Sequence, residues 1–168
     1  MPRPFSTPLQ LIELTRFYAD EVAGGHYPYV DYDPDERWHQ RLYRDRRVDV
    51  WLISWLPSQG VELHDHGGSS GSFTVLTGTL TEAVLRGGRL HDSARAAGES
   101  VGFGPHYVHD VRNLSAAPAV SVHAYSPPLT SMTYYDMAGD QLAARYTEPV
   151  DVRPSDGAVP ERAVTVEA

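Results

Sequence analysis

FTVLTGTLTEAVLRGG, residues 73–88, predicts two short strands, each followed by a turn. Apolar and β-branched residues favour extended chain, whereas Thr77-Gly78 and Gly87-Gly88 favour chain reversals. Strand-like runs with Gly or Pro turns between them occur from about Trp38 onward, for example at 48–55 and 119–125. Many short strands with little helix between them are typical of a sandwich or a barrel. The sequence therefore predicts a mainly β fold.

A helical segment precedes the strands. Ser6-Thr7-Pro8 offers a hydroxyl cap with proline in the first turn, and apolar residues follow at helical spacing up to Gly24-Gly25. The polar stretch 31–35 predicts a turn or a second short helix. We expect one domain over 1–168, with a helical region at about 6–35, a barrel at about 38–136 and an extended tail at about 150–168.

Composition excludes several classes of function. The chain has 168 residues and a net charge of −8, with no cysteine, and every basic residue is arginine. This acidic balance argues against nucleic acid as a partner. Disulfides, thiol nucleophiles and lysine chemistry are impossible. No apolar run approaches the ~20 residues of a membrane span and no signal peptide is visible, so we expect a cytoplasmic protein without a membrane partner.

The motif His64-Asp65-His66 is the strongest chemical signal. Residues i and i+2 of a strand point to the same face, so two imidazoles would meet at one point, where a metal satisfies both. A third ligand should come from another strand, and the candidates are His106, His109 and His123. The other histidines, His26, His39 and His91, are expected to be solvated or hydrogen-bonded. Three protein ligands leave open coordination positions, as catalysis requires.

Ser121, His123 and Tyr125 form a second group with strand spacing. One face would carry a hydroxyl, an imidazole and a phenol in a row, which can form a hydrogen-bonded relay. The alternative is the polar exposed face of an edge strand.

These segments together resemble the cysteine dioxygenases, the thiol dioxygenases of the cupin superfamily. His64, His66 and Gly78 fit the first cupin metal motif, and His109 and Asn113 fit the end of the second. Gly71 stands where cupins usually have a glutamate ligand, and loss of that glutamate marks the thiol dioxygenases. The stretch SVHAYSPP, residues 121–128, is similar to a segment beside the metal in that family. The resemblance covers about 38–136.

The resemblance implies a small cupin, a jelly-roll-like β-barrel, holding one Fe(II) through His64, His66 and His109. Nickel or zinc could replace iron in such a site. The partners would be a small thiol and O2, and L-cysteine would become cysteine sulfinic acid on a monomeric enzyme. Tyr125, oriented by His123 and Ser121, would contact the substrate or oxygen. Animal members cross-link this tyrosine to a cysteine near the position of Gly71, which this cysteine-free chain cannot do.

The residue that binds the substrate carboxylate is placed by the resemblance in or near 38–44. Arg41 is the predicted residue, and Gln40 and Arg44 are the alternatives. A guanidinium suits an amino-acid carboxylate, whereas a glutamine resembles the related 3-mercaptopropionate dioxygenases, so both substrates stay open. Two other classes also stay open. One is a cupin enzyme with a different reaction, such as an isomerase or a dioxygenase of a carbon substrate, and the other is a non-catalytic cupin that binds a small ligand.

Overall fold

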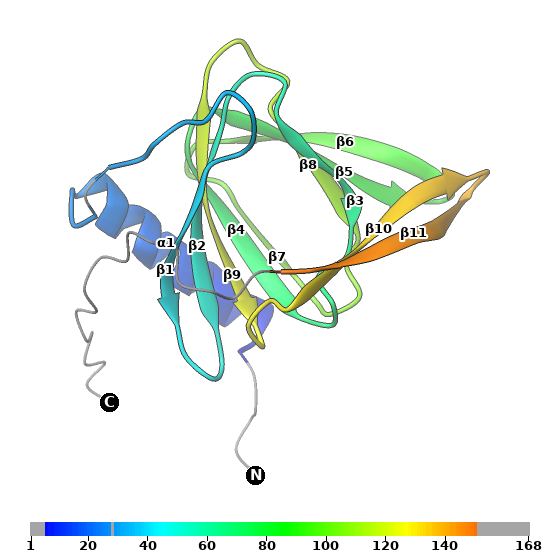
Figure 1. Cartoon of the computed structure of the whole chain (residues 1–168), viewed down its shortest axis with the longest axis horizontal. Coiled ribbons are helices and arrows are strands. Elements are labelled where there is room, and N and C mark those ends of the chain that lie inside the picture. Colours follow the sequence, from blue (N-terminus) through cyan, green and yellow to red (C-terminus); the bar gives the residue numbers. More distant parts are fainter. Residues whose placement is uncertain (1–5, 28, 151–168) are drawn as a thin grey trace.

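The computed structural model describes residues 6–27 and 29–150. One helix precedes a barrel of short strands (Figure 1). The elements are α1 (Pro8–Ala23), β1 (His39–Arg44), β2 (Asp49–Trp55), β3 (Gly60–His64), β4 (Ser70–Thr77), β5 (Thr79–Arg86), β6 (Arg89–Ala96), β7 (Ser100–Phe103), β8 (His109–Arg112), β9 (Ala119–Ser126), β10 (Ser131–Ala138) and β11 (Gln141–Pro149). The predicted fold class, mainly β with an N-terminal helix, is confirmed.

Two antiparallel sheets enclose the barrel interior. The first, sheet A, has the order β1-β2-β9-β4-β7, and the second, sheet B, has the order β11-β10-β3-β8-β5-β6. Alternate residues of each strand point to opposite faces. On β2, Trp51, Ile53 and Trp55 belong to the interior, while Val50 and Leu52 belong to a second core outside sheet A. This alternation fixes which side chains can reach the interior.

Helix α1 covers the outer face of sheet A (Figure 1). Thr7 caps it as predicted: its hydroxyl accepts from Gln10 N, and the Gln10 side chain accepts from Thr7 N in return. Leu11 and Tyr18 are buried against the sheet, and the buried Thr15 hydroxyl hydrogen-bonds Thr74 on β4 at 2.8 Å. The helix therefore closes the outer core and leaves the interior to the site.

The structure settles one open alternative and corrects one predicted boundary. The stretch 31–35 holds bends and no helix, which settles the alternative left open there. Strand pairing continues past the predicted barrel end at 136, because β10 and β11 form a hairpin that reaches Pro149. Most β11 side chains are exposed, so this strand lacks the apolar alternation that would have revealed it. The predicted tail, apart from Val150, lies outside the described residues.

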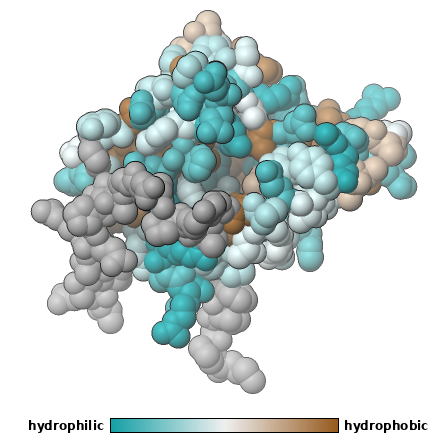
Figure 2. All heavy atoms as spheres, viewed as in Figure 1, coloured by the Kyte–Doolittle hydropathy of each residue, from teal (hydrophilic) through white to brown (hydrophobic). Residues whose placement is uncertain are grey.

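The surface is polar on the face that Figure 2 presents, where hydrophobic side chains show as separate small areas rather than one broad patch. Within 6–27 and 29–150, the structure has no helix long and apolar enough to cross a membrane.

Candidate metal centre

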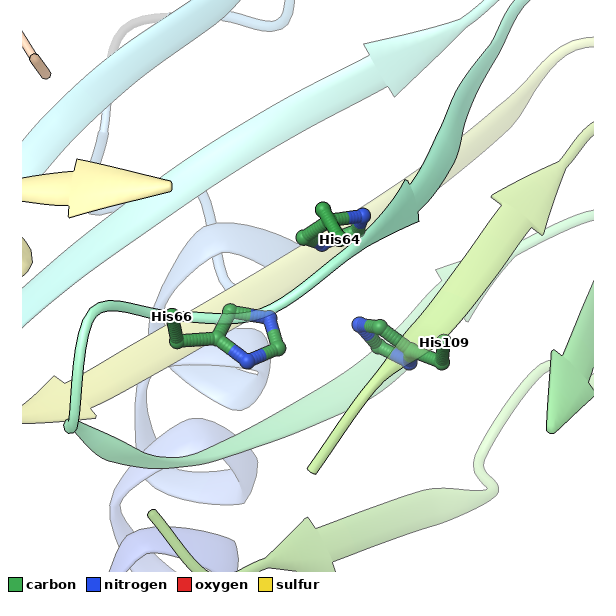
Figure 3. Close-up of side chains that lie close together, drawn as sticks. All are labelled: His64, His66 and His109. Carbon is green, nitrogen blue, oxygen red and sulfur yellow. The ribbon is translucent and has the colours of Figure 1, made fainter. Parts of the chain in front are cut away.

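Three buried histidines converge inside the barrel from sheet B and the loop after β3 (Figure 3). His64 ends β3 and lies directly opposite His109 on β8. His66 is two residues past His64, beyond the end of β3, so the pair spans a strand and a loop rather than one strand. Ring centroids are 4.8 to 5.0 Å apart for all three pairs, and one nitrogen from each ring falls within 4.8 Å of the others. The structure thus selects His109 from the three candidate third ligands.

The two strand histidines each use Nδ1 for a hydrogen bond to the protein. His64 Nδ1 is 2.7 Å from the backbone carbonyl oxygen of Glu62, and His109 Nδ1 is 3.0 Å from the Glu82 carboxylate. Both partners only accept, so each Nδ1 carries the hydrogen and each Nε2 has a free lone pair. Burial lowers the pKa of His64 well below its usual value, and the nearby His109 adds to this effect. The unprotonated ring is the form that binds a metal.

His66 provides the best indication that something is to be bound. Among the described residues, neither of its buried ring nitrogens has a hydrogen-bond partner. Burial lowers the pKa of His66 well below its usual value, and the nearby His64 and His109 lower it further. The backbone of Tyr107 acts in the opposite direction and raises this pKa. A buried polar atom without a partner is costly. A divalent transition metal that accepts one lone pair from each ring fits this donor set, and imidazole suits iron, nickel and zinc alike.

Gly71 leaves no room for a fourth protein ligand on β4. A Cβ at this position would clash with the Phe103 ring, which would have to move to admit a side chain. Phe103 itself stacks on His66, with ring centroids 4.6 Å apart. Gly71 also lies directly opposite Tyr125 across β4 and β9. The Phe103 ring therefore occupies the space that a carboxylate ligand from this position would need.

Ser121, His123 and Tyr125 form a connected chain in the interior, not an exposed edge. All three are buried on β9, which is a central strand of sheet A. Ser121 Oγ is 2.7 Å from His123 Nε2, and His123 Nδ1 is 3.3 Å from the Tyr125 hydroxyl. The three side chains therefore form the hydrogen-bonded relay that their spacing predicted. Tyr125 also stacks on His66, with ring centroids 5.4 Å apart.

Trp55 sets the direction of this relay. Its indole N–H donates to Ser121 Oγ at 2.9 Å, so the serine hydroxyl hydrogen is available for His123 Nε2. Burial lowers the pKa of His123 to about 3, so the ring is neutral and its remaining hydrogen sits on Nδ1, pointing to the Tyr125 oxygen. Burial also raises the pKa of Tyr125 above its usual value. The phenol is therefore protonated, and its own hydrogen is free to be donated into the site.

The candidates for binding a substrate carboxylate occupy different faces of β1. Arg41 pairs with Trp51, which faces the interior, and its guanidinium lies 5.7 Å from the Trp51 ring centroid. Gln40 pairs with Leu52, whose side chain belongs to the outer core. Arg44 is exposed near the end of the hairpin. Register thus puts Arg41 on the face of the relay and Gln40 on the face of α1.

Sequence reasoning missed Arg37, one residue before the segment considered for the carboxylate. Its guanidinium lies 4.8 Å from the Trp55 ring centroid, and its charge contributes to lowering the pKa of His64 and His123. Burial lowers the pKa of Arg37 itself. No periodic pattern surrounds this residue, so the sequence held no signal for it.

Glu82 was missed as well, although a signal existed. Leu80, Glu82 and Val84 share one face of β5, so an acid interrupts an apolar face. Glu82 is fully buried beside His109. Burial alone would raise its pKa, but hydrogen bonds from His109 and Tyr107 hold it below the usual value.

The remaining histidines lie away from this centre. His106 is exposed in the turn before β8, and His26, His39 and His91 are exposed too, as expected for solvated residues. Asn113, which ends the second motif, is fully buried and donates to the backbone oxygens of Trp55 and Ala117. Its side chain holds the turn after β8, where it also accepts from Ser115.

The fold and the three-histidine site together define a cupin-type barrel. A Klebsiella pneumoniae protein with a double-stranded β-helix domain has 18% identity and a TM-score of 0.53, covering 76% of this chain and 94% of its own. A Thermus thermophilus protein has 25% identity and a TM-score of 0.53, covering 59% of this chain and 90% of its own. These similarities establish the fold.

The family follows from the sequence profile of cysteine dioxygenase type I, which matches residues 11–138, so the chain belongs to that family. The zebrafish (Danio rerio) cysteine dioxygenase type 1 is 28% identical in an alignment of 103 residues, and the match covers 54% of this chain. The match spans about half the length of that curated relative. The family resemblance expected from the histidine motifs is thereby confirmed.

Proposed function

We propose that this protein is an Fe(II)-dependent thiol dioxygenase that oxidises L-cysteine to cysteine sulfinic acid. One observation carries the proposal: a buried three-histidine cluster lies beside a phenol whose hydrogen is free to be donated, with His66 and Tyr125 stacked at 5.4 Å. Membership of the cysteine dioxygenase type I family supports the same reaction class.

The residues take distinct roles in this proposal. His64, His66 and His109 would hold the iron, which when bound supplies a site for the thiolate sulfur and the redox chemistry that dioxygen needs. Tyr125 donates a hydrogen bond to the reacting groups, and its raised pKa keeps that hydrogen in place. His123 and Ser121 fix the phenol through the relay. Arg41 is proposed to bind the substrate carboxylate, with Arg37 as a second guanidinium on the same interior face.

The reaction balances without another reductant. R–SH and O2 give R–SO2H: two S–O bonds form, the O–O bond breaks, sulfur is oxidised and dioxygen is reduced. The thiol would lose its proton on binding, and that proton would return to the product acid or to solvent. A dication held by three neutral ligands favours thiolate over thiol, which agrees with an all-histidine site.

Oxygen uptake by protein loaded anaerobically with Fe(II) tests the proposal. L-cysteine and 3-mercaptopropionate are offered separately, and the sulfinate is identified by mass spectrometry. The expected result is uptake with L-cysteine and formation of its sulfinate. Uptake only with 3-mercaptopropionate would keep the reaction class and replace the substrate. Loaded protein that consumes oxygen with neither thiol would contradict the proposal and favour a cupin of another reaction or a non-catalytic one.

A further inference from the structure

The two strand histidines of the metal centre are held by groups of different charge. His64 donates to a neutral backbone carbonyl, that of Glu62, at 2.7 Å. His109 donates to the carboxylate of Glu82 at 3.0 Å. Otherwise the two ligands are alike, because both are buried, both leave Nε2 free and they face each other across β3 and β8. The difference therefore lies in Glu82.

Glu82 is built into the barrel as an ion. Its side chain is fully buried on β5, and donors surround both of its oxygens. The Tyr107 hydroxyl and His109 Nδ1 donate to Oε1. Arg95 donates to Oε2 through Nε at 3.0 Å, and a terminal nitrogen of the same guanidinium lies 2.9 Å from that oxygen as an ion pair. A guanidinium fork of this kind stabilises a carboxylate that burial would otherwise disfavour.

We propose that Glu82 is a positioning residue for the metal centre: through its hydrogen bond it fixes the Nδ1–H form of His109 and makes this imidazole a stronger donor than His64. Carboxylates behind metal-binding histidines orient the ring and raise its basicity. The inference rests on the metal centre of the proposed function. It predicts tighter metal binding and a lower reduction potential for bound iron than a neutral partner would give.

The position of Glu82 explains how negative charge reaches a site that has no carboxylate ligand. Phe103 fills the space beside Gly71, so a carboxylate cannot approach from β4. Glu82 instead approaches from sheet B, behind His109, and Arg95 and Tyr107 hold it at this distance. The carboxylate thus acts through an imidazole rather than as a ligand.

The first test is E82Q, with the affinity for Co(II) measured by competition with a chelator. Glutamine keeps the shape and can still accept from His109, but it carries no charge. We expect Co(II) binding about 10- to 100-fold weaker than in the unaltered protein, and a higher midpoint potential after loading with iron. The matched control is E62Q, which removes an exposed carboxylate that pairs with Arg145 at 2.8 Å and leaves the backbone carbonyl that holds His64. E62Q should bind Co(II) like the unaltered protein.

A double variant separates the role of Glu82 toward His109 from its ion pair with Arg95. In E82Q alone, the NH2 group of the glutamine faces the N–H groups of Arg95. Both are hydrogen-bond donors, so the fold is weakened locally. E82Q/R95M removes both charges and this conflict. Recovery of the Co(II) affinity in the double variant would show that only the ion pair matters and would overturn the proposal. Persistent weak binding in a protein with an unaltered circular dichroism spectrum is the expected result.

Unchanged Co(II) affinity and iron potential in E82Q would also overturn it. Neither readout requires turnover. A protein that binds Co(II) through the three histidines but oxidises no thiol would contradict the proposed function and leave the test of Glu82 intact.

Discussion

The two halves of the site differ in how their polar atoms are satisfied. On the sheet A side, Trp55, Ser121, His123 and Tyr125 form a chain in which each member meets the next. On the sheet B side, three imidazoles face one another, and the ring nitrogens of His66 have no hydrogen-bond partner among the described residues. The relay is complete as a protein structure. The histidine cluster leaves ring nitrogens without a hydrogen-bond partner in the protein, and a metal ion fits that arrangement.

This difference predicts separate responses to mutation. Changes in the cluster should abolish metal binding, because each removes one of the three imidazoles. A change at His109 also removes a hydrogen bond to the buried Glu82, so the fold of that variant is checked separately. Changes in the relay should leave the metal in place and alter the rate or the stability, because buried hydrogen bonds are broken there.

The largest effect is expected for H109A, which should lose stoichiometric iron binding and all thiol oxidation. Two imidazoles are too few to hold the metal firmly. The measurement is metal content after anaerobic loading, with circular dichroism to verify the fold. H106A is the matched control, because His106 is exposed three residues away and should be silent. Full iron content in H109A would show that the ligand set is wrong.

Y125F should keep the iron and lose about 100-fold or more in kcat, since loss of a positioned proton donor commonly costs 10²- to 10⁴-fold. The phenol hydrogen is the group that the relay leaves free to be donated. Iron content and oxygen uptake are measured on the same sample. Y146F, on exposed β11, serves as the control. A rate equal to that of the unaltered protein would remove the relay from the mechanism.

Asp49, buried opposite Tyr125, should make stability depend on pH. Burial raises its pKa from 3.8 to about 6, although hydrogen bonds from Trp51 and Leu129 oppose the rise. The folded pKa lies above the unfolded one, so the folded protein favours the protonated carboxyl of Asp49. The contribution of this group to the free energy of unfolding is therefore complete below about pH 4 and is lost as the pH rises to about 6. The loss is about 3 kcal/mol, at 1.36 kcal/mol per unit.

The measurement is urea unfolding of D49N and the unaltered protein at several pH values. Asparagine does not titrate, so D49N should gain about 3 kcal/mol relative to the unaltered protein between about pH 4 and pH 7. Two parallel stability curves would mean that Asp49 is ionised in the fold without cost.

R41M should raise KM for L-cysteine by about 10- to 100-fold with iron content unchanged, as expected for one charge-assisted hydrogen bond of about 1.5–3 kcal/mol. R44M and Q40A are the comparison variants, and R37M tests the second guanidinium. If Q40A carries the loss, the register argument for β1 is wrong. If R37M alone carries it, the guanidinium over Trp55 binds the carboxylate.

Much of this arrangement could be predicted because it depends on short-range spacing. The i, i+2 rule placed Ser121, His123 and Tyr125 on one face, and the helix start at Thr7 follows from its cap. Local spacing alone left His106, His109 and His123 open as the third ligand. The family resemblance pointed to His109, and the pairing of β3 with β8 puts it opposite His64. Glu82 had a signal, an acid on an apolar strand face, but its partner His109 lies on another strand. Arg37 had no such signal, and the Trp55 ring that it contacts lies far along the chain.

The central claim is that both atoms of one dioxygen molecule are transferred to the sulfur of a thiol held at the three-histidine centre. The most direct test supplies iron-loaded protein with L-cysteine under oxygen gas enriched in the heavy isotope and weighs the sulfinate by mass spectrometry. Incorporation of two heavy atoms in each product molecule is the predicted result. A sulfinate with one heavy atom, or disulfide as the sole product, would contradict the account.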